Sequence, residues 1–344
     1  MILKERLQNN YDFLRVFAAL SVTFTHSFDL LNKSQNEVLT KLTNGRVNFS
    51  FVGLSIFFSI SGYLVAKSAA TSPSLKNYLW KRFLRIQPML FVLCILTVFI
   101  LGPGFSTFSL KEYFNNNNSW SYFRNILPLF GMQFTLPDVF LTNIKVAEVN
   151  GSLWTLVLEE RLYLFLSLLF CIKQSKKIFF ILIVAALNLI YLIKSLNFFD
   201  FDIPFMESFI GFYPLIFLNA SVCFLLQIKF GKGKFIYLLI SLAIIILAIT
   251  FKPLSFLQLF AIPVFVIGIA HLKGAFNIAG KYGDFTYGIY IFSFPVQQIF
   301  IAKGMFLNSP YQLFFATLLT VIPMAVLSWH FIEKKMLTLR NRVK

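Results

Sequence analysis

The sequence is poor in charge and in reactive side chains for a chain of 344 residues. Charged residues make up 13% of it, against about 25% in an average soluble domain. There are three histidines and three cysteines, and Cys94, Cys171 and Cys223 all lie inside apolar runs without the spacing of metal ligands. The sequence therefore predicts neither a disulfide scaffold nor a metal site.

Apolar residues are abundant instead. Hydrophobic residues make up 58% of the chain, which includes 45 Phe, and the mean hydropathy is +0.74. One globular core of this length would leave too little polar surface to cover so much apolar area. The composition excludes a soluble enzyme and a disordered chain, and it predicts an all-α, polytopic bundle of membrane-spanning helices.

Ten runs are long and apolar enough to be candidate spans, since a span needs about 20 mainly apolar residues. They are 12–31, 48–67, 87–102, 153–172, 176–193, 208–228, 235–251, 255–272, 285–303 and 311–332. Gly102-Pro103-Gly104 is a breaker expected to end the third span. The apolar stretch 124–134 is too short to cross, and we interpret it as a re-entrant or interfacial piece.

The net charge of +17 would indicate nucleic-acid binding in a soluble protein. Here the basic residues lie in short tracts between apolar runs, so they predict topology and attraction to anionic membrane lipid rather than a nucleic-acid partner. Counted by alternate loops, 20 of the 31 Lys and Arg residues fall on one side and nine on the other. The positive-inside rule then places both termini and residues 68–86 in the cytoplasm, and residues 103–152 outside.

Arg15 and His26 are ionisable residues within the first predicted span, where charge is costly and usually functional. They are 11 residues apart, so on a helix they share a face and are separated by about 16 Å. Arg15 could instead snorkel to lipid headgroups, and His26 could pack through a simple hydrogen bond. A histidine at this depth could also act as the general base for a hydroxyl group.

Glu159, Glu160 and Arg161 form a second charged group, within the fourth predicted span. Adjacent helical residues point about 100° apart, so the three cannot face one place, whereas Tyr163 lies one turn from Glu159 on the same face. A structural pair between Glu160 or Arg161 and another helix is the alternative. Counted from the outer ends of their spans, Glu159 is expected at the same depth in the membrane as His26, where its carboxylate could orient the imidazole. Asp29, three residues after His26 on the same helix, is the alternative partner.

Arg82 and Arg85 lie in the predicted cytoplasmic loop after the second span. On a helix, their spacing would place both guanidinium groups on one face. Such a face suits a ligand that carries phosphate, although positive-inside anchoring would also explain it.

Six motifs, taken together and in order, resemble the acyltransferase-3 family of integral membrane O-acyltransferases. They are Arg15 with His26, preceded by Asp12; the run Phe57–Leu64, which contains Ser61; Arg82-x-x-Arg85 with Pro88; Trp154, Glu159 and Tyr163; Thr286–Pro295, which contains Tyr290; and Trp329 with Glu333. The resemblance covers residues 11–335 as one membrane domain and leaves residues 336–344 as a short basic cytoplasmic tail.

The resemblance implies transfer of an acyl group, usually acetyl, from cytoplasmic acetyl-CoA to a hydroxyl of a cell-surface polysaccharide or lipid-linked glycan precursor. It implies no permanently bound cofactor, a place in the bacterial inner membrane, and other envelope-polysaccharide enzymes as possible partners. His26, Arg15 and Glu159 are the expected catalytic residues, and Arg82 and Arg85 are the expected donor-binding residues. Asp12, Ser61, Trp154, Tyr163 and Tyr290 are expected to support them.

Two features depart from the family pattern. Many members have a histidine where this sequence has Ser293, so this position supplies no imidazole. Some members carry an attached extracytoplasmic hydrolase-like domain, but nothing follows Lys344, so we expect this chain to act alone or with a separate partner.

Two other classes of function stay open at this point. A transporter or flippase for a lipid-linked glycan would also carry charges within its spans, although no inverted repeat is visible. A membrane glycosyltransferase would need acidic residues in its first outer loop. Glu37 alone is weak evidence for this function.

Overall fold

The computed structural model is helical throughout the residues that it describes, which are 9–145, 147–171, 177–196, 209–228, 234–272, 276 and 279–342. No β-strand forms in this part of the chain. Its β-type hydrogen bonding is limited to an isolated antiparallel bridge between Ser106 and Val139. The predicted all-α class is therefore confirmed. Predicted span residues 172, 176 and 208, and residues 343–344 of the predicted tail, lie outside the described residues.

Each predicted span overlaps a helix. The ten helices are α2 (Tyr11–Asp29), α4 (Phe49–Thr71), α5 (Leu75–Leu96), α9 (Trp154–Cys171), α10 (Lys177–Ser195), α12 (Phe212–Leu225), α13 (Lys234–Thr250), α14 (Gln258–Ala270), α15 (Thr286–Ala302) and α16 (Pro310–Ser328). Within the described residues, five helical stretches are long and apolar enough to cross a membrane: Phe49–Thr71, Leu75–Phe105, Lys177–Ser195, Lys252–Ala270 and Pro310–Thr338. The count of ten crossings, and the side on which the termini lie, stay predictions.

The third helix differs from its predicted bounds at both ends. It begins at Leu75, where the Ser74 side chain accepts a hydrogen bond from Asn77 N at 3.2 Å and so caps the new helix. It continues through a π-helical turn (Thr97–Leu101) into α6 (Gly102–Phe105). The Gly-Pro-Gly breaker acts three residues later than predicted, because Pro103 occupies the first turn of α6, where proline is tolerated.

Short helices fill the segment predicted to be the longest outer loop. They are α7 (Leu110–Asn115), α8 (Asn117–Ser121) and the 3₁₀ turns Tyr122–Ile126, Pro128–Phe130 and Gly151–Leu153. The stretch 124–134 does not cross the bundle, and its Pro128–Phe130 turn packs against α9.

Close backbone approach, rather than large side chains, sets the distance from α4 to its neighbours. A Cβ on Gly62 would lie 2.0 Å from the Phe217 carbonyl oxygen of α12, and one on Gly53 would lie 2.6 Å from the Ala18 oxygen of α2. Small residues at such crossings are typical of helices that pack in membranes. Gly62 follows Ser61 directly, so the same packing fixes the position of a predicted site residue.

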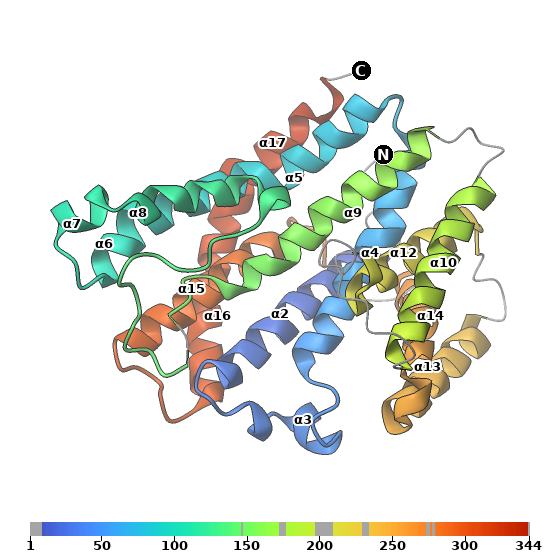
Figure 1. Cartoon of the computed structure of the whole chain (residues 1–344), viewed down its shortest axis with the longest axis horizontal. Helices are drawn as coiled ribbons and strands as arrows, with labels where there is room; N and C mark the ends of the chain where they lie inside the picture. The colour runs from blue at the N-terminus through green and yellow to red at the C-terminus, as the bar shows by residue number, and fades with distance from the viewer. Residues whose placement is uncertain are drawn as a thin grey trace.

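Different connecting segments lie at the two ends of the helix bundle. The turn between α4 and α5 and the C-terminal helix α17 (Lys334–Thr338) lie together at the upper end in Figure 1, whereas α3 (Val38–Leu42) lies at the lower end. Trp80 Nε1 donates a hydrogen bond to the Leu339 carbonyl at 3.1 Å, which fastens the C-terminal segment to α5. The two segments predicted to be cytoplasmic therefore share one end of the molecule.

Candidate active site

A cavity of about 570 Å³ lies between α2, α4, α5, α9 and the start of α15, with the C-terminal segment along one edge. Its volume is in the range of ligand pockets, which is about 300–1,000 Å³. The charged side chains in its wall are six basic ones and two acidic ones: Arg15, Lys67, Lys81, Arg82, Arg85, Arg340, Glu159 and Asp284. This excess of positive charge suits an anionic ligand.

The two predicted donor-binding arginines lie on a helix, and the prediction of a loop there is wrong. Arg82 and Arg85 lie in the first half of α5, three residues apart, so they share a face that lines the cavity. The linker before this helix is short because Ser72 already ends α4 and Ser74 caps α5. The side chain of Arg82 lies over the Tyr163 ring, with Cζ 5.5 Å from the ring centroid.

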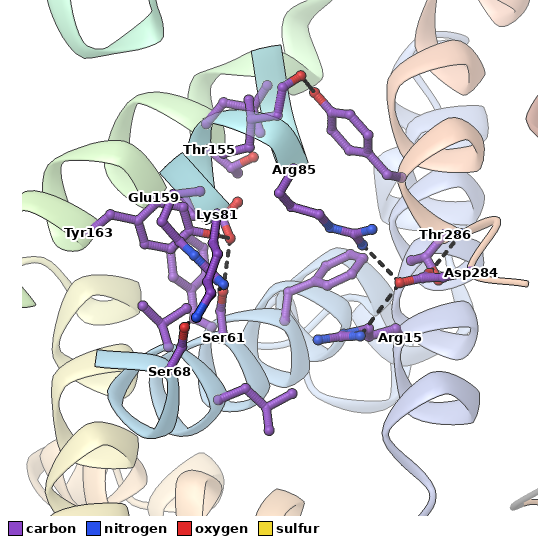
Figure 2. Close-up of a pocket in the computed structure, with 18 of the residues that line it drawn as sticks. Arg15, Ser61, Ser68, Lys81, Arg85, Thr155, Glu159, Tyr163, Asp284 and Thr286 are labelled. Atoms are coloured by element: carbon purple, nitrogen blue, oxygen red, sulfur yellow. Dashed lines mark hydrogen bonds and ion pairs between the residues drawn. The ribbon is translucent and has the colours of Figure 1, made fainter. Parts of the chain in front are cut away.

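Asp284 joins two cavity arginines from different helices. Its Oδ2 lies 2.9 Å from Arg85 Nη2 and 3.5 Å from Arg15 Nη1, as Figure 2 shows. Arg15 also lies 3.5 Å from Asp12 Oδ1, and Arg85 lies 3.9 Å from Glu333 Oε2. The Asp284 side chain is 1% exposed, so this is a buried charge cluster in which removal of one partner is costly.

Sequence analysis missed Asp284, although a signal was present. Asp284 and Thr286 stand directly before a predicted span, and an aspartate at a helix start accepts hydrogen bonds from free backbone amides. In the structure Asp284 Oδ1 accepts from Thr286 N at 3.3 Å. This contact leaves Oδ2 facing the arginines.

Glu159 lies in the cavity wall with hydroxyl groups around it. Its Oε1 accepts hydrogen bonds from Ser61 Oγ, at 2.8 Å, and from the Tyr163 hydroxyl. The three predicted site residues Ser61, Glu159 and Tyr163 therefore come together (Figure 2).

Glu160 faces away from Glu159 toward the outer segment, as the helical geometry predicts. Its carboxylate accepts hydrogen bonds from Gln87 Nε2 and, at 2.7 Å, from the backbone N–H of Leu129. Glu160 is a structural residue that holds the Pro128–Phe130 turn against α9 and α5. Its partners are thus the side-chain amide of Gln87 on α5 and a backbone N–H group.

Within the part of the chain that the structure describes, His26 is not one of the residues that line the cavity. Its ring packs edge-on against Phe294, with centroids 5.2 Å apart, and Asp29 is close enough to interact with it electrostatically. A Cβ at Gly151 would come within 3.0 Å of the Phe294 ring, so His26 is level with Gly151. Glu159 follows eight residues later, or about 12 Å deeper at the rise of a helix.

The contacts of α4 give the same separation. Ser50 N donates to Thr25 Oγ1 at 2.7 Å, next to His26 in sequence, whereas Ser61 is 11 residues further along α4. Ser61 and Glu159 therefore lie at the depth of Arg15, and the predicted pairing of Glu159 with His26 is wrong. The error arose because the prediction took residue 153 to lie level with the end of the first span at residue 31, whereas Gly151 is level with His26 in the structure.

The supporting residues divide between the cavity and its surroundings. The Tyr290 hydroxyl lies in the cavity wall, 2.7 Å from Thr155 Oγ1 and 2.8 Å from the Ser152 carbonyl. Trp154 is 38% exposed and its ring packs at a tilt against Tyr213, outside the cavity. Asp12 acts through Arg15, as described above.

Ser293 and Glu37 have structural partners. Ser293 accepts a hydrogen bond from Thr23 Oγ1 at 3.0 Å and donates one to the Ile289 carbonyl at 2.6 Å, which joins α2 to α15. Glu37 is buried and accepts a hydrogen bond from Phe49 N at the start of α4. Burial raises the pKa of the Glu37 carboxyl. Glu37 thus has a helix-capping role, which removes the support for a glycosyltransferase.

No group of three or more His, Cys, Asp or Glu side chains with the arrangement of a metal site occurs within the described ranges.

Comparison with known proteins identifies the family. A family model described as an acyltransferase domain matches residues 8–329, and it is the acyltransferase-3 model. The chain belongs to this acyltransferase family. It is 30% identical to an O-acetyl transferase of Shigella phage Sf6 over 96% of both chains. It is 28% identical to Nodulation protein 10 of Rhizobium leguminosarum over 97% of this chain and 94% of that one.

A shorter match links this acyltransferase to a peptidoglycan O-acetyltransferase of Listeria monocytogenes, at 30% identity over 34% of this chain and 20% of the relative. No solved structure matches the chain. The family and these relatives make the protein an enzyme, an O-acetyltransferase with apolar helices suited to a membrane.

Proposed function

We propose that this O-acetyltransferase takes acetyl from cytoplasmic acetyl-CoA and transfers it to a hydroxyl group of a cell-surface polysaccharide or its lipid-linked precursor. The observation that carries the donor is the cavity with six basic and two acidic side chains in its wall. It lies at the end of the bundle predicted to face the cytoplasm. Acetyl-CoA is a soluble polyanion in that compartment, so its charge and its location both fit this cavity.

The donor binds with its nucleotide toward Arg82 and with the arm that carries the thioester running past Arg15. Arg82 lies in the first half of α5, whereas Arg15 lies on α2 beside Asp284. Arg15 is therefore placed to orient this arm on its way to His26. Glu159, with Ser61 and Tyr163, forms the polar wall on the other side.

His26 is the base that removes the proton of the acceptor hydroxyl. The acceptor oxygen forms an ester bond with the acetyl carbon, the thioester bond breaks, and coenzyme A leaves as the thiol. His26 follows Arg15 by 11 residues on α2, a rise of about 16 Å, so the acetyl end of the donor must extend outward along α2 to meet the acceptor. This geometry lets a cytoplasmic donor and an outer acceptor enter from opposite ends.

The acceptor is a glycan by chemical class. One relative is named a peptidoglycan O-acetyltransferase, and another an O-acetyl transferase. The location that follows is the bacterial inner membrane, with ten crossings and both termini in the cytoplasm. Other enzymes of envelope-polysaccharide synthesis would supply the acceptor.

Transfer of label tests this function. Membranes that contain the protein are incubated with radiolabelled acetyl-CoA and purified envelope glycan, and mild alkali then releases ester-bound label. We expect label in the glycan with wild-type protein and none with His26→Ala at equal protein level. Glycan that crosses the membrane without gaining label would contradict the proposal and favour a flippase.

A further inference from the structure

The six basic side chains of the cavity fall into two groups that differ in charge balance. Arg15 and Arg85 form ion pairs with Asp12, Asp284 and Glu333, so acidic groups offset the positive charge there. Lys67, Lys81, Arg82 and Arg340 make no ion pair within the described part of the chain. In Figure 2 the Arg15–Asp284–Arg85 cluster lies to the right of the cavity, and Lys81 and Ser68 lie to its left.

The unbalanced group is held in place without neutralisation. Lys81 Nζ donates to Ser72 Oγ at 3.0 Å, and Arg82 Nη2 lies 3.4 Å from Ser68 Oγ. Lys81 is close enough to both Arg82 and Arg340 for their like charges to repel. Hydroxyl partners orient Lys81 and Arg82 but leave the positive charge of the group unmatched, which an anion would relieve.

Arg82 has an unused donor as well. Its Nε is buried and has no hydrogen-bond partner, and its planar group lies over the Tyr163 ring. A buried donor without a partner is unfavourable, and a guanidinium group can bind a phosphate with two parallel N–H groups. Glu159 in the cavity wall already accepts hydrogen bonds from Ser61 and Tyr163, and Asp284 is paired with Arg15 and Arg85.

Arg340 brings the C-terminal segment into this site. Leu337 and Arg340 line the cavity, and Trp80 fixes Leu339 to α5 through its hydrogen bond at 3.1 Å. Residues predicted to form a short basic tail thus lie at the edge of the donor cavity. They belong to α17 and to the turn that follows it, Leu339–Asn341.

We infer that Lys67, Lys81, Arg82 and Arg340 form a phosphate subsite that binds the nucleotide part of the acyl donor, while Arg85 positions Asp284 and Arg15 and does not bind phosphate. This rests on the proposed function, since it takes a nucleotide thioester as the donor. The C-terminal segment is then part of the enzyme's donor specificity. An anionic lipid headgroup shares the chemistry of this ligand, and the test separates the two.

The test compares two donors in purified protein reconstituted into lipid nanodiscs. Acetyl-CoA carries the nucleotide and its phosphates, whereas acetyl-pantetheine has the same thioester arm without a nucleotide or a phosphate. We expect Arg340→Gln and Lys81→Gln each to raise the KM for acetyl-CoA about tenfold with kcat unchanged, since each loses a charge-assisted contact. With acetyl-pantetheine, both variants should keep the KM of the wild type.

Three further variants complete the design. Arg340→Lys should restore part of the affinity, and Lys335→Gln, at an exposed position on α17 before the turn that carries Arg340, should match wild type with both donors. Arg85→Gln should impair both donors equally. An equal effect of Arg340→Gln on both donors, at unchanged thermal stability, would overturn the inference.

A second part of the experiment varies the lipid composition of the nanodiscs. The tenfold effect should persist in nanodiscs of neutral lipid, and an effect that occurs only with anionic phosphatidylglycerol would assign the four side chains to a lipid headgroup. Failure of the proposed function has a different result, because wild-type protein would then transfer no acetyl from either donor.

Discussion

Arg85 of α5 and Asp284, just before α15, form an ion pair of 2.9 Å inside the cavity. The same carboxylate lies 3.5 Å from Arg15 of α2. Asp284 thereby connects three helices that are far apart in sequence, and it does so at the residue that the family resemblance marks as catalytic. The position of Arg15 in the site depends on this carboxylate.

The first prediction concerns Asp284. Asp284→Asn leaves two partly exposed guanidinium groups without the buried anion that they share. The cost should lie below the about 3–5 kcal/mol of breaking a fully buried pair. We expect transfer to fall at least tenfold and the melting temperature to fall with it. Asp284→Glu, which keeps the charge, should retain more activity.

A double-mutant cycle shows whether Asp284 acts through Arg85. Asp284→Asn combined with Arg85→Gln should be no worse than the poorer single variant, since the two residues share one interaction. Losses that simply add would show that Asp284 has a separate role.

The second prediction separates two adjacent carboxylates. Glu159→Gln removes the charge beside Ser61 and Tyr163 in the cavity, so kcat should fall about tenfold or more while the protein stays folded, because a charged hydrogen bond contributes about 1.5–3 kcal/mol. Activity and thermal unfolding are measured on the same detergent-solubilised preparation.

Glu160→Gln is the matched control. Its amide would place a donor against Gln87 or the Leu129 N–H, a mismatch that costs about 1–3 kcal/mol. The melting temperature should fall, with kcat per folded molecule unchanged. If instead Glu160→Gln lowers kcat and Glu159→Gln does not, the assignment of the two residues is reversed.

The third prediction follows from the distance between His26 and the cavity. His26→Ala should lower kcat by about 10²–10⁴-fold, the usual contribution of a general base. The affinity for acetyl-CoA should not change, because His26 does not line the donor cavity. Steady-state transfer and direct donor binding measure the two quantities.

His330 provides the control, since it is exposed on the same chain. His330→Ala should behave as wild type in both assays. A large loss of donor binding in His26→Ala would contradict the separation of base and donor.

The fourth prediction tests topology. Ser74 caps α5, so the neighbouring exposed Lys76 is the better site for a single cysteine, with exposed Asn117 as its partner. Cysteines replace these residues one at a time in a chain without its native cysteines. An impermeant maleimide should label Asn117→Cys in intact cells, and Lys76→Cys only after lysis. The opposite pattern would place the donor cavity outside, where it could not reach cytoplasmic acetyl-CoA.

Apolar run length and charge were sufficient to predict the helices, because membrane helices are selected by hydropathy over about 20 residues. The same reasoning placed Arg82 and Arg85 in a loop, since it takes charged residues as the ends of spans, and helix capping by Ser74 could not be weighed against that rule. Depth was the weakest step. It assumed that residue 153 lies level with the end of the first span at residue 31, whereas Gly151 is level with His26.

Site residues that carry a motif were found from the sequence, and those that act through tertiary contacts were not. Ser61, Glu159 and Tyr163 come together as the resemblance implies. Asp284 and Arg340 reach the cavity only through the packing of α15 and the C-terminal segment, which no local pattern encodes.

A structure of the enzyme with bound coenzyme A tests the central claim most directly. The account predicts the phosphates beside Arg82, Lys81 and Arg340, and the thiol directed past Arg15 toward His26. Coenzyme A bound outside this cavity, or with its phosphates on Arg85 in place of Asp284, would contradict it.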